Sequence, residues 1–502
     1  MKGPCLLGID IGTYSSKGVI VSQAGAVLAS AVSEHELSMP RPGYAEHDPE
    51  KVWWADFFAI IRSLFASSAV KPAQVAGIAI STISPAVVPV DGQGRALRPA
   101  ILYGIDTRAT REIADLESRT GRHFDTQSAC PKVLWIRRNE PEVWSRTRRI
   151  VNGSGFFTLR LTGEATIDVY DATIFAPLFD PESMSWSTAA EDLVAPVSLM
   201  PRITWTAEVA GRVTREAAKE TGLPEGTPVI TGTADAAAEA VSAGLADDGD
   251  MMLMYGSSTF FILKTSRLVE PRGFWGTRFL ERDSFAVAGG TATAGSLTRW
   301  FRDTLGSPEV EAAKAGGREA YEALADLAAG SPAGANGLLV LPYFSGERTP
   351  IHDPEARGMI FGLTLRHTRK DLYRAVLESV GHSIRHNIEV LRQQGCAARR
   401  ILAVGGGTRN PLWMQIVSDI AGITQSVPQE QVGASYGDAF LAGLGIGMFS
   451  AMKEIDAWVR PGATYEPAAG TRALYDEYHA IYRDLYTTSA GCMHRLGRVA
   501  GG

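Results

Sequence analysis

The sequence predicts an α/β protein built from two large domains. Its 502 residues exceed what one hydrophobic core usually serves, so two domains of roughly 200–270 residues are expected. Short β-rich runs alternate with helical stretches, which is typical of layered α/β architecture. A β-run, a Gly/Ser/Thr turn and a second β-run occupy residues 7–21, and a looser copy occupies residues 251–263. This repetition predicts two related lobes that face one cleft.

The predicted boundary between the domains lies in the acidic, glycine-containing stretch 246–250. We therefore expect an N-terminal domain over residues 1–247 and a C-terminal domain over residues 248–502. The expected strands are 6–11, 18–22, 75–81, 229–232, 251–255, 260–264, 337–342 and 400–404. The expected helices are 48–66, 107–120, 234–243, 370–394, 411–421 and 473–488.

Composition excludes several classes of protein. A formal net charge of -6 offers no basic excess to displace counterions from nucleic-acid phosphates. The chain lacks an apolar run of the roughly 18 residues that a membrane span needs. Four scattered cysteines without zinc-type spacing, together with a strand pattern that begins close to the N-terminus, predict a cytoplasmic protein with reduced thiols.

The first hairpin carries the residues that phosphate and magnesium require. Asp10 offers a carboxylate, Gly12 a turn with free backbone N–H groups, Thr13 and Ser15 hydroxyls, and Lys17 an ammonium group. Backbone and hydroxyl donors bind phosphate, and a carboxylate oxygen suits Mg²⁺. An ordinary hairpin whose hydroxyls satisfy their own backbone is the alternative. Neither a Walker A loop nor a GxGxxG fingerprint occurs, so both common nucleotide-binding motifs are excluded.

Asp235 stands where a short β-run hands over to an alanine-rich helix. The first turn of a helix directs N–H groups and partial positive charge toward whatever lies in front of it. A carboxylate at this position is either a helix cap or a catalytic base directed into a cleft. The residue types alone leave both interpretations open.

Two further glycine-rich turns, 289–295 and 405–410, follow predicted strands. Glycine runs allow the backbone to approach a flat or anionic ligand closely, as nucleotide binding requires. Tight turns without a ligand are the alternative.

Two other patterns are interpreted structurally. His382 and His386 have the i, i+4 spacing of a metal pair but lack the glutamate of an HExxH motif, so partly exposed helix residues are the better account. The arginine-rich stretches 135–138 and 146–149 are interpreted as solvated surface in preference to a polyanion site.

Over nearly its whole length the chain resembles the FGGY carbohydrate kinases, close to their xylulokinase-like branch. Residues 358–378 fit the C-terminal signature of that family throughout, and residues 132–139 fit the core of its other signature. Residues 346–350 and 161–168 are similar to further landmarks of the family.

The resemblance implies two actin-like domains of the ribonuclease H-like, hexokinase/Hsp70 type, with ATP and a sugar in a catalytic interdomain cleft. It implies Asp235 as catalytic base, and Asp10 and Asp235 as the residues around Mg²⁺. The residues implied to bind ATP are Gly12, Thr13, Ser15, Lys17, Gly256, Ser257, Ser258, Gly290, Thr291, Gly405, Gly406 and Asn410. In such a site Asp235 would accept the proton of the attacking hydroxyl while the protein positions the triphosphate.

The substrate side departs from the xylulokinase pattern. Where xylulokinases carry Gln-Met-His, this chain reads Ile83-Ser84-Pro85, and Ala236 replaces an amide that follows the catalytic aspartate. Ser84, Tyr103, Asp106 and Asp235 are the expected sugar-binding residues. Because sites that read hydroxyls by hydrogen bonds discriminate strongly, these replacements can change the substrate.

The sequence therefore predicts an ATP- and Mg²⁺-dependent kinase for a small-molecule sugar, with a ketopentose such as xylulose as the nominal substrate. Another ketose or a polyol is the first alternative. An actin-fold ATPase switch and a sugar sensor without kinase activity are the others. Nucleic acid and membrane are not expected partners, and a homodimer is left open.

Overall fold

The computed structural model describes residues 3–500 and divides them into two compact units. Unit 1 comprises the described residues up to Ala246 together with Arg278–Ser284 and Val432–Val459. Unit 2 comprises Asp247–Thr277, Phe285–Gln431 and the described residues from Arg460 onward. The boundary predicted from the sequence, between residues 247 and 248, would divide the chain into two continuous domains, and it stays a prediction.

Unit 1 is built on a seven-stranded sheet with the order β13-β14-β5-β1-β2-β3, in which β15 also pairs with β5. Its strands are β1 (Cys5–Ile11), β2 (Ser15–Ser22), β3 (Val27–Glu34), β5 (Val75–Thr82), β13 (Val209–Arg212), β14 (Pro228–Ile230) and β15 (Thr233–Ala234). β1 is antiparallel to β2 and parallel to β5, and β5 is parallel to β15.

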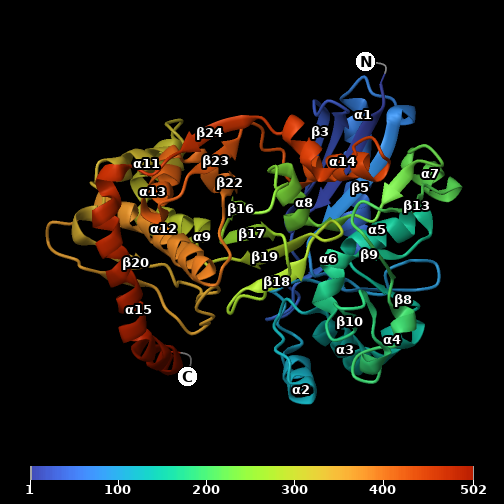
Figure 1. Cartoon of the computed structure of the whole chain (residues 1–502), viewed down its shortest axis with the longest axis horizontal. Helices are drawn as coiled ribbons and strands as arrows, with labels where there is room; N and C mark the ends of the chain where they lie inside the picture. The colour runs from blue at the N-terminus through green and yellow to red at the C-terminus, as the bar shows by residue number, and fades with distance from the viewer. Residues whose placement is uncertain (1–2, 501–502) are drawn as a thin grey trace. The chain divides into compact units, whose positions relative to one another are not determined.

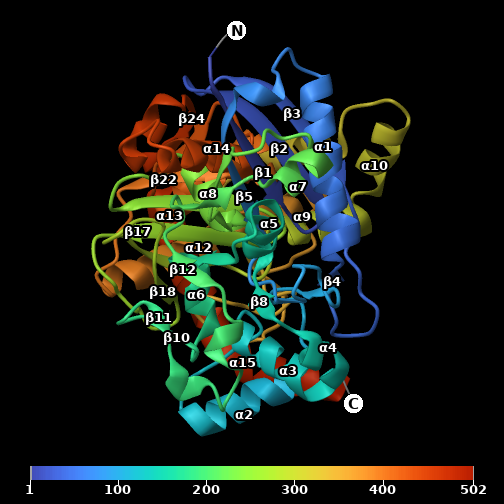
Figure 2. The same ribbon diagram turned by 90° about the vertical axis from the view of Figure 1, so that its right-hand side faces the viewer.

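Helices cover both faces of this sheet. On one face α1 (Ala55–Ala66) packs closely, since a Cβ at Gly18 of β2 would lie 2.3 Å from Ile60. On the other face α14 (Ala434–Gly445) approaches so closely that a Cβ at Gly8 would lie 1.9 Å from the carbonyl oxygen of Ser435. Figure 1 and Figure 2 show both helices beside the strands. Glycine in β1 and β2 is therefore what permits this packing.

The remaining elements of unit 1 are short, and many of them surround a second apolar core that contains Leu116, Val133 and Phe179. Its other helices are α2 (Thr110–Thr120), α3 (Ala129–Asn139), α4 (Pro141–Arg146), α5 (Gly153–Thr162), α6 (Val169–Ala172), α7 (Arg215–Thr221) and α8 (Asp235–Ser242). Its other strands are β4 (Glu46–His47), β6 (Val88–Val90), β7 (Ala100–Ile101), β8 (Arg149–Val151), β9 (Thr166–Asp168), β10 (Phe179–Asp180), β11 (Ser185–Trp186) and β12 (Arg202–Thr204).

Unit 2 contains a second seven-stranded sheet, with the order β18-β19-β17-β16-β22-β23-β24. Its strands are β16 (Asp250–Tyr255), β17 (Thr259–Thr265), β18 (Trp275–Arg278), β19 (Phe285–Gly289), β22 (Arg400–Val404), β23 (Gln425–Pro428) and β24 (Pro461–Tyr465). A separate hairpin pairs β20 (Leu339–Leu341) with β21 (Met359–Phe361).

Alternate residues of β16, namely Met251, Leu253 and Tyr255, enter the largest core of unit 2 together with residues of α12 and α13. This period of two places the three side chains on one face of the strand. The helices of unit 2 are α9 (Gly295–Leu305), α10 (Ser307–Lys314), α11 (Ala320–Ala329), α12 (Arg369–Gln393), α13 (Pro411–Ala421) and α15 (Arg472–Ala500).

Candidate active site

The two aspartates predicted around the metal lie at the same end of the sheet of unit 1. The parallel strands β1, β5 and β15 are neighbours, and their register aligns Asp10 with Ser81 and Ser81 with Thr233. Asp235 follows the last residue of β15 and is the first residue of α8. The carboxyl ends of parallel strands are the usual place for ligands in α/β sheets. The fold thus brings together residues that are far apart in sequence.

Asp10 is buried, with 8% of its surface exposed. Burial raises its pKa to about 6, while the charge of Lys17 and a contact with Ser81 oppose the rise. The Ser81 hydroxyl donates to Asp438 Oδ2 at 2.6 Å and lies 3.5 Å from Asp10 Oδ1. Because a hydroxyl has one proton, the shorter contact takes it. Asp10 consequently keeps oxygen lone pairs for a ligand.

Asp235 is partly exposed, and its Oδ1 accepts the backbone N–H of Ala236 at 2.7 Å. Burial and then the charge of Asp10 raise the pKa of Asp235 well above its usual value, against the opposing effect of that hydrogen bond. Asp171 and Glu239 raise it further. A carboxylate with a raised pKa is a stronger base, which suits proton abstraction.

Glu239 completes the acidic face of α8. It lies four residues after Asp235, so both side chains point to the same side of the helix. Burial and the charge of Asp10 raise the pKa of Glu239 to about 7, and Lys17 opposes the rise. The i, i+4 spacing was visible in the sequence, whereas Asp438 carried no comparable signal.

A further carboxylate that sequence reasoning missed, Asp171, anchors the predicted sugar residue Ser84. The hydroxyl of Ser84 donates to Asp171 Oδ1 at 2.7 Å, and Asn152 Nδ2 donates to Oδ2 at 2.7 Å. Burial raises the pKa of Asp171 to about 6 despite these two hydrogen bonds. Because Asp171 also raises the pKa of Asp235, Ser84 belongs to the same group of charges.

Asp106 is engaged differently from the other predicted sugar residues. It is 2% exposed; Oδ2 accepts the backbone N–H of Ala45 at 2.7 Å, and both oxygens accept hydrogen bonds from Arg108. Arg108 also donates to Glu46 at 2.7 Å. The other predicted residue, Tyr103, lies with its hydroxyl 2.8 Å from the hydroxyl of Thr13. The geometry of Asp106 is that of a buried ion pair that holds backbone in place.

The predicted phosphate hairpin is supported from inside unit 1. The Gly12 N–H donates to the Ser15 carbonyl at 3.0 Å and closes the turn. Ser16 points inward and donates to Asp56 Oδ2 at 2.7 Å, and His35 joins that carboxylate to the Gly12 carbonyl. Ser15 and Lys17 remain partly exposed on the other side.

In unit 2 the predicted ATP-binding residues lie on three loops that follow β16, β19 and β22. β16 is parallel to β22 and pairs Met254 with Val404, so the loops that begin at Gly256 and Gly405 are adjacent. The third loop is tied to β17, because the Thr291 N–H donates to the Thr259 carbonyl at 3.1 Å. All three loops therefore lie at one end of the second sheet.

The predicted residues of two of these loops are at least partly exposed, whereas Gly290 and Thr291 of the third loop are buried. The Thr291 hydroxyl is buried 2.9 Å from that of Thr259, and Asn410 caps α13 by accepting the Trp413 N–H at 3.1 Å. A Cβ at Gly406 would meet nothing within 4 Å. The phosphate-loop residues Gly256, Ser257 and Ser258 are partly or fully exposed. The N–H groups of Gly256, Gly290 and Thr291 are already used within the fold, since they donate to Ser258, Thr349 and Thr259.

Among residues 3–500, no three His, Cys, Asp or Glu side chains are arranged to hold a metal ion directly. The predicted exposure of the histidine pair was wrong for His382, which is 0% exposed in the core of unit 2. Its neighbour His386 is partly buried.

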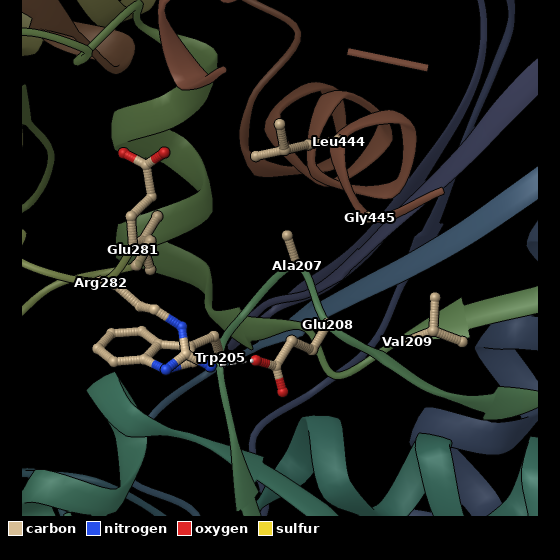
Figure 3. Close-up of a pocket in the computed structure, with 9 residues that line it drawn as sticks. Trp205, Ala207, Glu208, Val209, Glu281, Arg282, Leu444 and Gly445 are labelled. Atoms are coloured by element: carbon tan, nitrogen blue, oxygen red, sulfur yellow. Dashed lines mark hydrogen bonds and ion pairs between the residues drawn. The ribbon is translucent and has the colours of Figure 1, made fainter. Parts of the chain in front are cut away.

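Unit 1 also contains a hollow of about 400 Å³ beside β13, lined by Trp205, Glu208, Arg282 and Leu444 among others. Figure 3 shows the Arg282 side chain extending toward Trp205 and Glu208. Its guanidinium lies 5.6 Å from the Trp205 ring centre and 3.1 Å from a Glu208 carboxylate oxygen. The charge of Arg282 is thus already paired with that of Glu208. We therefore treat this hollow as a structural feature, separate from the acidic cluster.

Comparisons with known proteins agree with this architecture. Models of the FGGY family of carbohydrate kinases match residues 5–242 (N-terminal domain) and residues 251–446 (C-terminal domain). The chain is 30% identical over 489 residues to xylulose kinase of Staphylococcus epidermidis, with 96% of each chain covered. It is also 30% identical to glycerol kinase 1 of Pseudomonas aeruginosa, with 90% of this chain and 92% of that one covered.

The crystal structure of xylulose kinase from Rhodospirillum rubrum has a TM-score of 0.88 and 33% identity, with 98% of this chain and 100% of that chain covered. The predicted two-domain α/β fold of the actin-like type is confirmed. No helix within residues 3–500 has the length and apolar character needed to cross a membrane. From these matches, which extend over almost all of both chains, we conclude that the chain belongs to the FGGY family of carbohydrate kinases.

Proposed function

We propose that the protein transfers the γ-phosphoryl group of ATP to a hydroxyl of a ketopentose, with Asp235 as general base. The observation that carries the proposal is the position of Asp235, at a helix start beside Asp10, with a pKa raised well above its usual value. In the reaction the sugar hydroxyl gives its proton to Asp235 and its oxygen bonds to the γ-phosphorus. The bond from that phosphorus to the β–γ bridging oxygen breaks, and ADP leaves.

The residues around Asp235 fit a bound divalent cation. Burial raises the pKa of Asp10 to about 6, and burial followed by the charge of Asp10 raises the pKa of Glu239 to about 7. A cation and the Lys17 ammonium would offset this charge, and Asp10 and Asp235 are the residues that would hold Mg²⁺. When bound, Mg²⁺ neutralises phosphate charge during transfer.

For the nucleotide we propose the three loops of unit 2. In unit 1 the hairpin residues Gly12, Thr13, Ser15 and Lys17 stay the predicted phosphate-binding residues. Phosphates bind to backbone N–H groups and hydroxyls, and Ser257, Ser258 and Gly406 of these loops are at least partly exposed. Since the Thr291 and Asn410 side chains are used inside the fold, we expect these two residues to position backbone rather than contact ATP by their side chains.

For the sugar we propose Ser84 and Tyr103 beside Asp235. Asp106 is reassigned, because its oxygens are occupied by Arg108 and Ala45; it would shape the site by holding Arg108. Xylulose is the favoured substrate because the relatives named above include xylulose kinases. The glycerol kinase relative at the same identity keeps a polyol as the alternative.

The test is a coupled assay of ADP release with D-xylulose, other ketopentoses, ketohexoses and polyols. We expect ADP release that depends on Mg²⁺ and on a ketopentose. ADP release that needs no sugar and is stimulated by a second protein would indicate an ATPase switch. Sugar binding without ADP release would indicate a sensor. A cytoplasmic setting fits the use of ATP, and a homodimer stays a prediction.

A further inference from the structure

A second cavity of unit 1 lies apart from the acidic cluster. It has a volume of about 560 Å³, and its lining includes Arg148, Arg149, Arg202, Trp186 and Leu159. Cavities of roughly 300–1,000 Å³ accommodate small molecules. The elements that form it are β8, the C-terminal end of α5, β11 and the start of β12. β8 and α5 are labelled in Figure 1, and β12 in Figure 2.

The three arginines of this cavity have no carboxylate partner within residues 3–500. Arg148 donates to the carbonyls of Ser145 and Thr147, and Arg149 to those of Arg148 and Ser198. Arg202 donates to the Ala210 carbonyl at 3.3 Å. A guanidinium has five N–H donors, so each arginine keeps donors for a ligand.

This arrangement differs from that of the hollow in Figure 3, where Arg282 is paired with Glu208. Two carboxylates do line the arginine cavity. Asp91 is committed to its own turn, since its Oδ1 accepts the N–H groups of Gln93 and Arg95 at 2.9 and 3.0 Å. Glu164 remains as an acceptor. The lining therefore combines excess positive charge with one group that can accept hydrogen bonds from hydroxyls.

One wall of the cavity is rigid and apolar. The Trp186 indole donates to the Pro201 carbonyl at 2.7 Å, and its ring packs edge-on against Phe175 and Phe179 at 6.0 and 6.1 Å. Leu159 also lines the cavity. A fixed indole gives contact area to the carbon face of a small ligand at little cost in side-chain entropy.

We propose that this cavity binds a phosphorylated sugar of pentose size, with its phosphate on the arginines. Arginine binds phosphate through paired, charge-assisted hydrogen bonds, which favours a phosphate monoester over a neutral sugar. Glu164 would accept from the hydroxyls and Trp186 would contact the carbon skeleton. No residue of the proposed catalytic site lines the cavity, so this is a second site.

The elements that line the cavity continue to the acidic cluster. β8 begins at Arg149, and the residue after it, Asn152, donates to Asp171. β9 follows Ala165 of the cavity and ends at Asp168, which accepts the Asp171 N–H at 3.0 Å. Movement at one end of these short strands would thus displace Asp171 at the other. We expect the occupied cavity to change the KM for the sugar, as an effector site does.

Titration calorimetry at physiological salt tests the binding, with ribose 5-phosphate as the probe and free ribose as the uncharged comparison. We expect saturable binding of the phosphate ester alone, and a loss of affinity of about tenfold or more in Arg149→Gln/Arg202→Gln. Both arginines are exposed, so the variant should fold, as thermal melting will show. Arg146→Gln, an exposed arginine outside the lining, is the matched control and should bind normally.

Two outcomes overturn the proposal. One is the absence of saturable binding at ribose 5-phosphate concentrations up to about 100 times a Kd in the micromolar range. The other is equal affinity of the native protein and the double variant for ribose 5-phosphate. If Asp235→Ala lost binding of ribose 5-phosphate while the double arginine variant kept it, the probe would bind in the catalytic site, and the proposal would again be overturned. The coupling is tested by the KM for the sugar, which should respond to ribose 5-phosphate in the native protein and not in the double variant. An unchanged KM at saturating probe would contradict the coupling. The calorimetric result does not depend on the proposed reaction.

Discussion

The two sheets end in contrasting surfaces. In unit 1 the strand ends carry Asp10 and Asp235, with Glu239 beside them, and the pKa of each carboxyl is raised. In unit 2 the corresponding loops carry glycines, hydroxyls and backbone N–H groups, and the side chain of Asn410 is used as a helix cap. Related architectures are thus adapted to different tasks: a cluster of repelling carboxylates suits proton transfer and cation binding, whereas uncharged donors suit a nucleotide.

Substitution of Asp235 should have the largest effect. For Asp235→Ala we expect kcat to fall by about 10²–10⁴-fold, the usual contribution of a general base. The affinity for ADP should stay within several-fold, because the nucleotide is assigned mainly to unit 2. Stability should not fall, since the raised pKa shows that the fold disfavours the charged carboxylate. The coupled ADP assay, calorimetry with ADP and thermal melting measure the three quantities.

Glu216→Gln is the matched control, because Glu216 also stands in the first turn of a helix but is exposed on α7. Its kcat should equal that of the native protein. Undiminished kcat in Asp235→Ala would remove the proposed base and, with it, the contrast between the two strand ends.

Asp106 tests the division within unit 1 between residues that react and residues that hold the site in place. Asp106→Ala should lower the free energy of unfolding by about 3 kcal/mol, since removal of one partner of a buried ion pair costs roughly 3–5 kcal/mol and Arg108 keeps Glu46. Urea unfolding measures this change. Asp115→Ala breaks an exposed pair with Arg138 and should cost about 1 kcal/mol or less. If Asp106→Ala instead raised the KM for the sugar and left stability unchanged, Asp106 would be a sugar-binding residue.

Gly406 tests the uncharged surface of unit 2. A Cβ there meets no atom within 4 Å, so Gly406→Ala should fold normally while its methyl group hinders close approach of a nucleotide to the backbone. We expect a roughly tenfold weaker Kd for ADP, about 1.4 kcal/mol, by calorimetry. Gly470→Ala, at another glycine of unit 2 with open space around it, should bind ADP normally. Equal affinities in the two variants would separate this loop from the nucleotide.

Sequence reasoning found the parts of the site that are contiguous along the chain. Asp10 and Lys17 lie in one hairpin and Asp235 lies in one strand-to-helix turn, so local chemistry named them as candidates, while the family resemblance gave Asp235 its predicted role. Helix α13 was predicted with its observed bounds, because proline and glycine mark its two ends. Helix α15 continues beyond the predicted residue 488 to Ala500, where the apolar periodicity weakens.

The remaining features depend on contacts between distant residues, which one sequence does not reveal. Asp438 reaches Ser81 across 357 positions, and Asp171 contacts Ser84 only because β5 and α6 are brought together. The same holds for Thr291 and Asp106: the family resemblance implied both as ligand-binding residues, yet tertiary contacts already occupy their side chains. Residue type identifies candidates, and long-range packing decides which side chains stay available.

The prediction with the smallest expected effect concerns a buried ionisable group that lies outside both strand ends. His382 of α12 is fully buried, and its ring stacks 5.6 Å from that of His479 and 5.4 Å from that of Tyr482. Within residues 3–500 neither of its ring nitrogens has a hydrogen-bond partner. Burial, followed by the charges of His479 and Arg385, lowers its pKa well below 6.5. Below pH 6.5 the unfolded chain binds a proton at this histidine and the folded chain does not, so stability falls as pH falls.

His382→Phe should keep the stacked ring and remove this dependence. Relative to the native protein, its free energy of unfolding should rise by about 1.4 kcal/mol for each pH unit below 6.5, measured by urea unfolding at pH 7.5 and 5.5. His123→Phe, at an exposed histidine, controls for the loss of an imidazole as such. The same difference at both pH values would show that His382 binds its proton equally in the folded and unfolded chain.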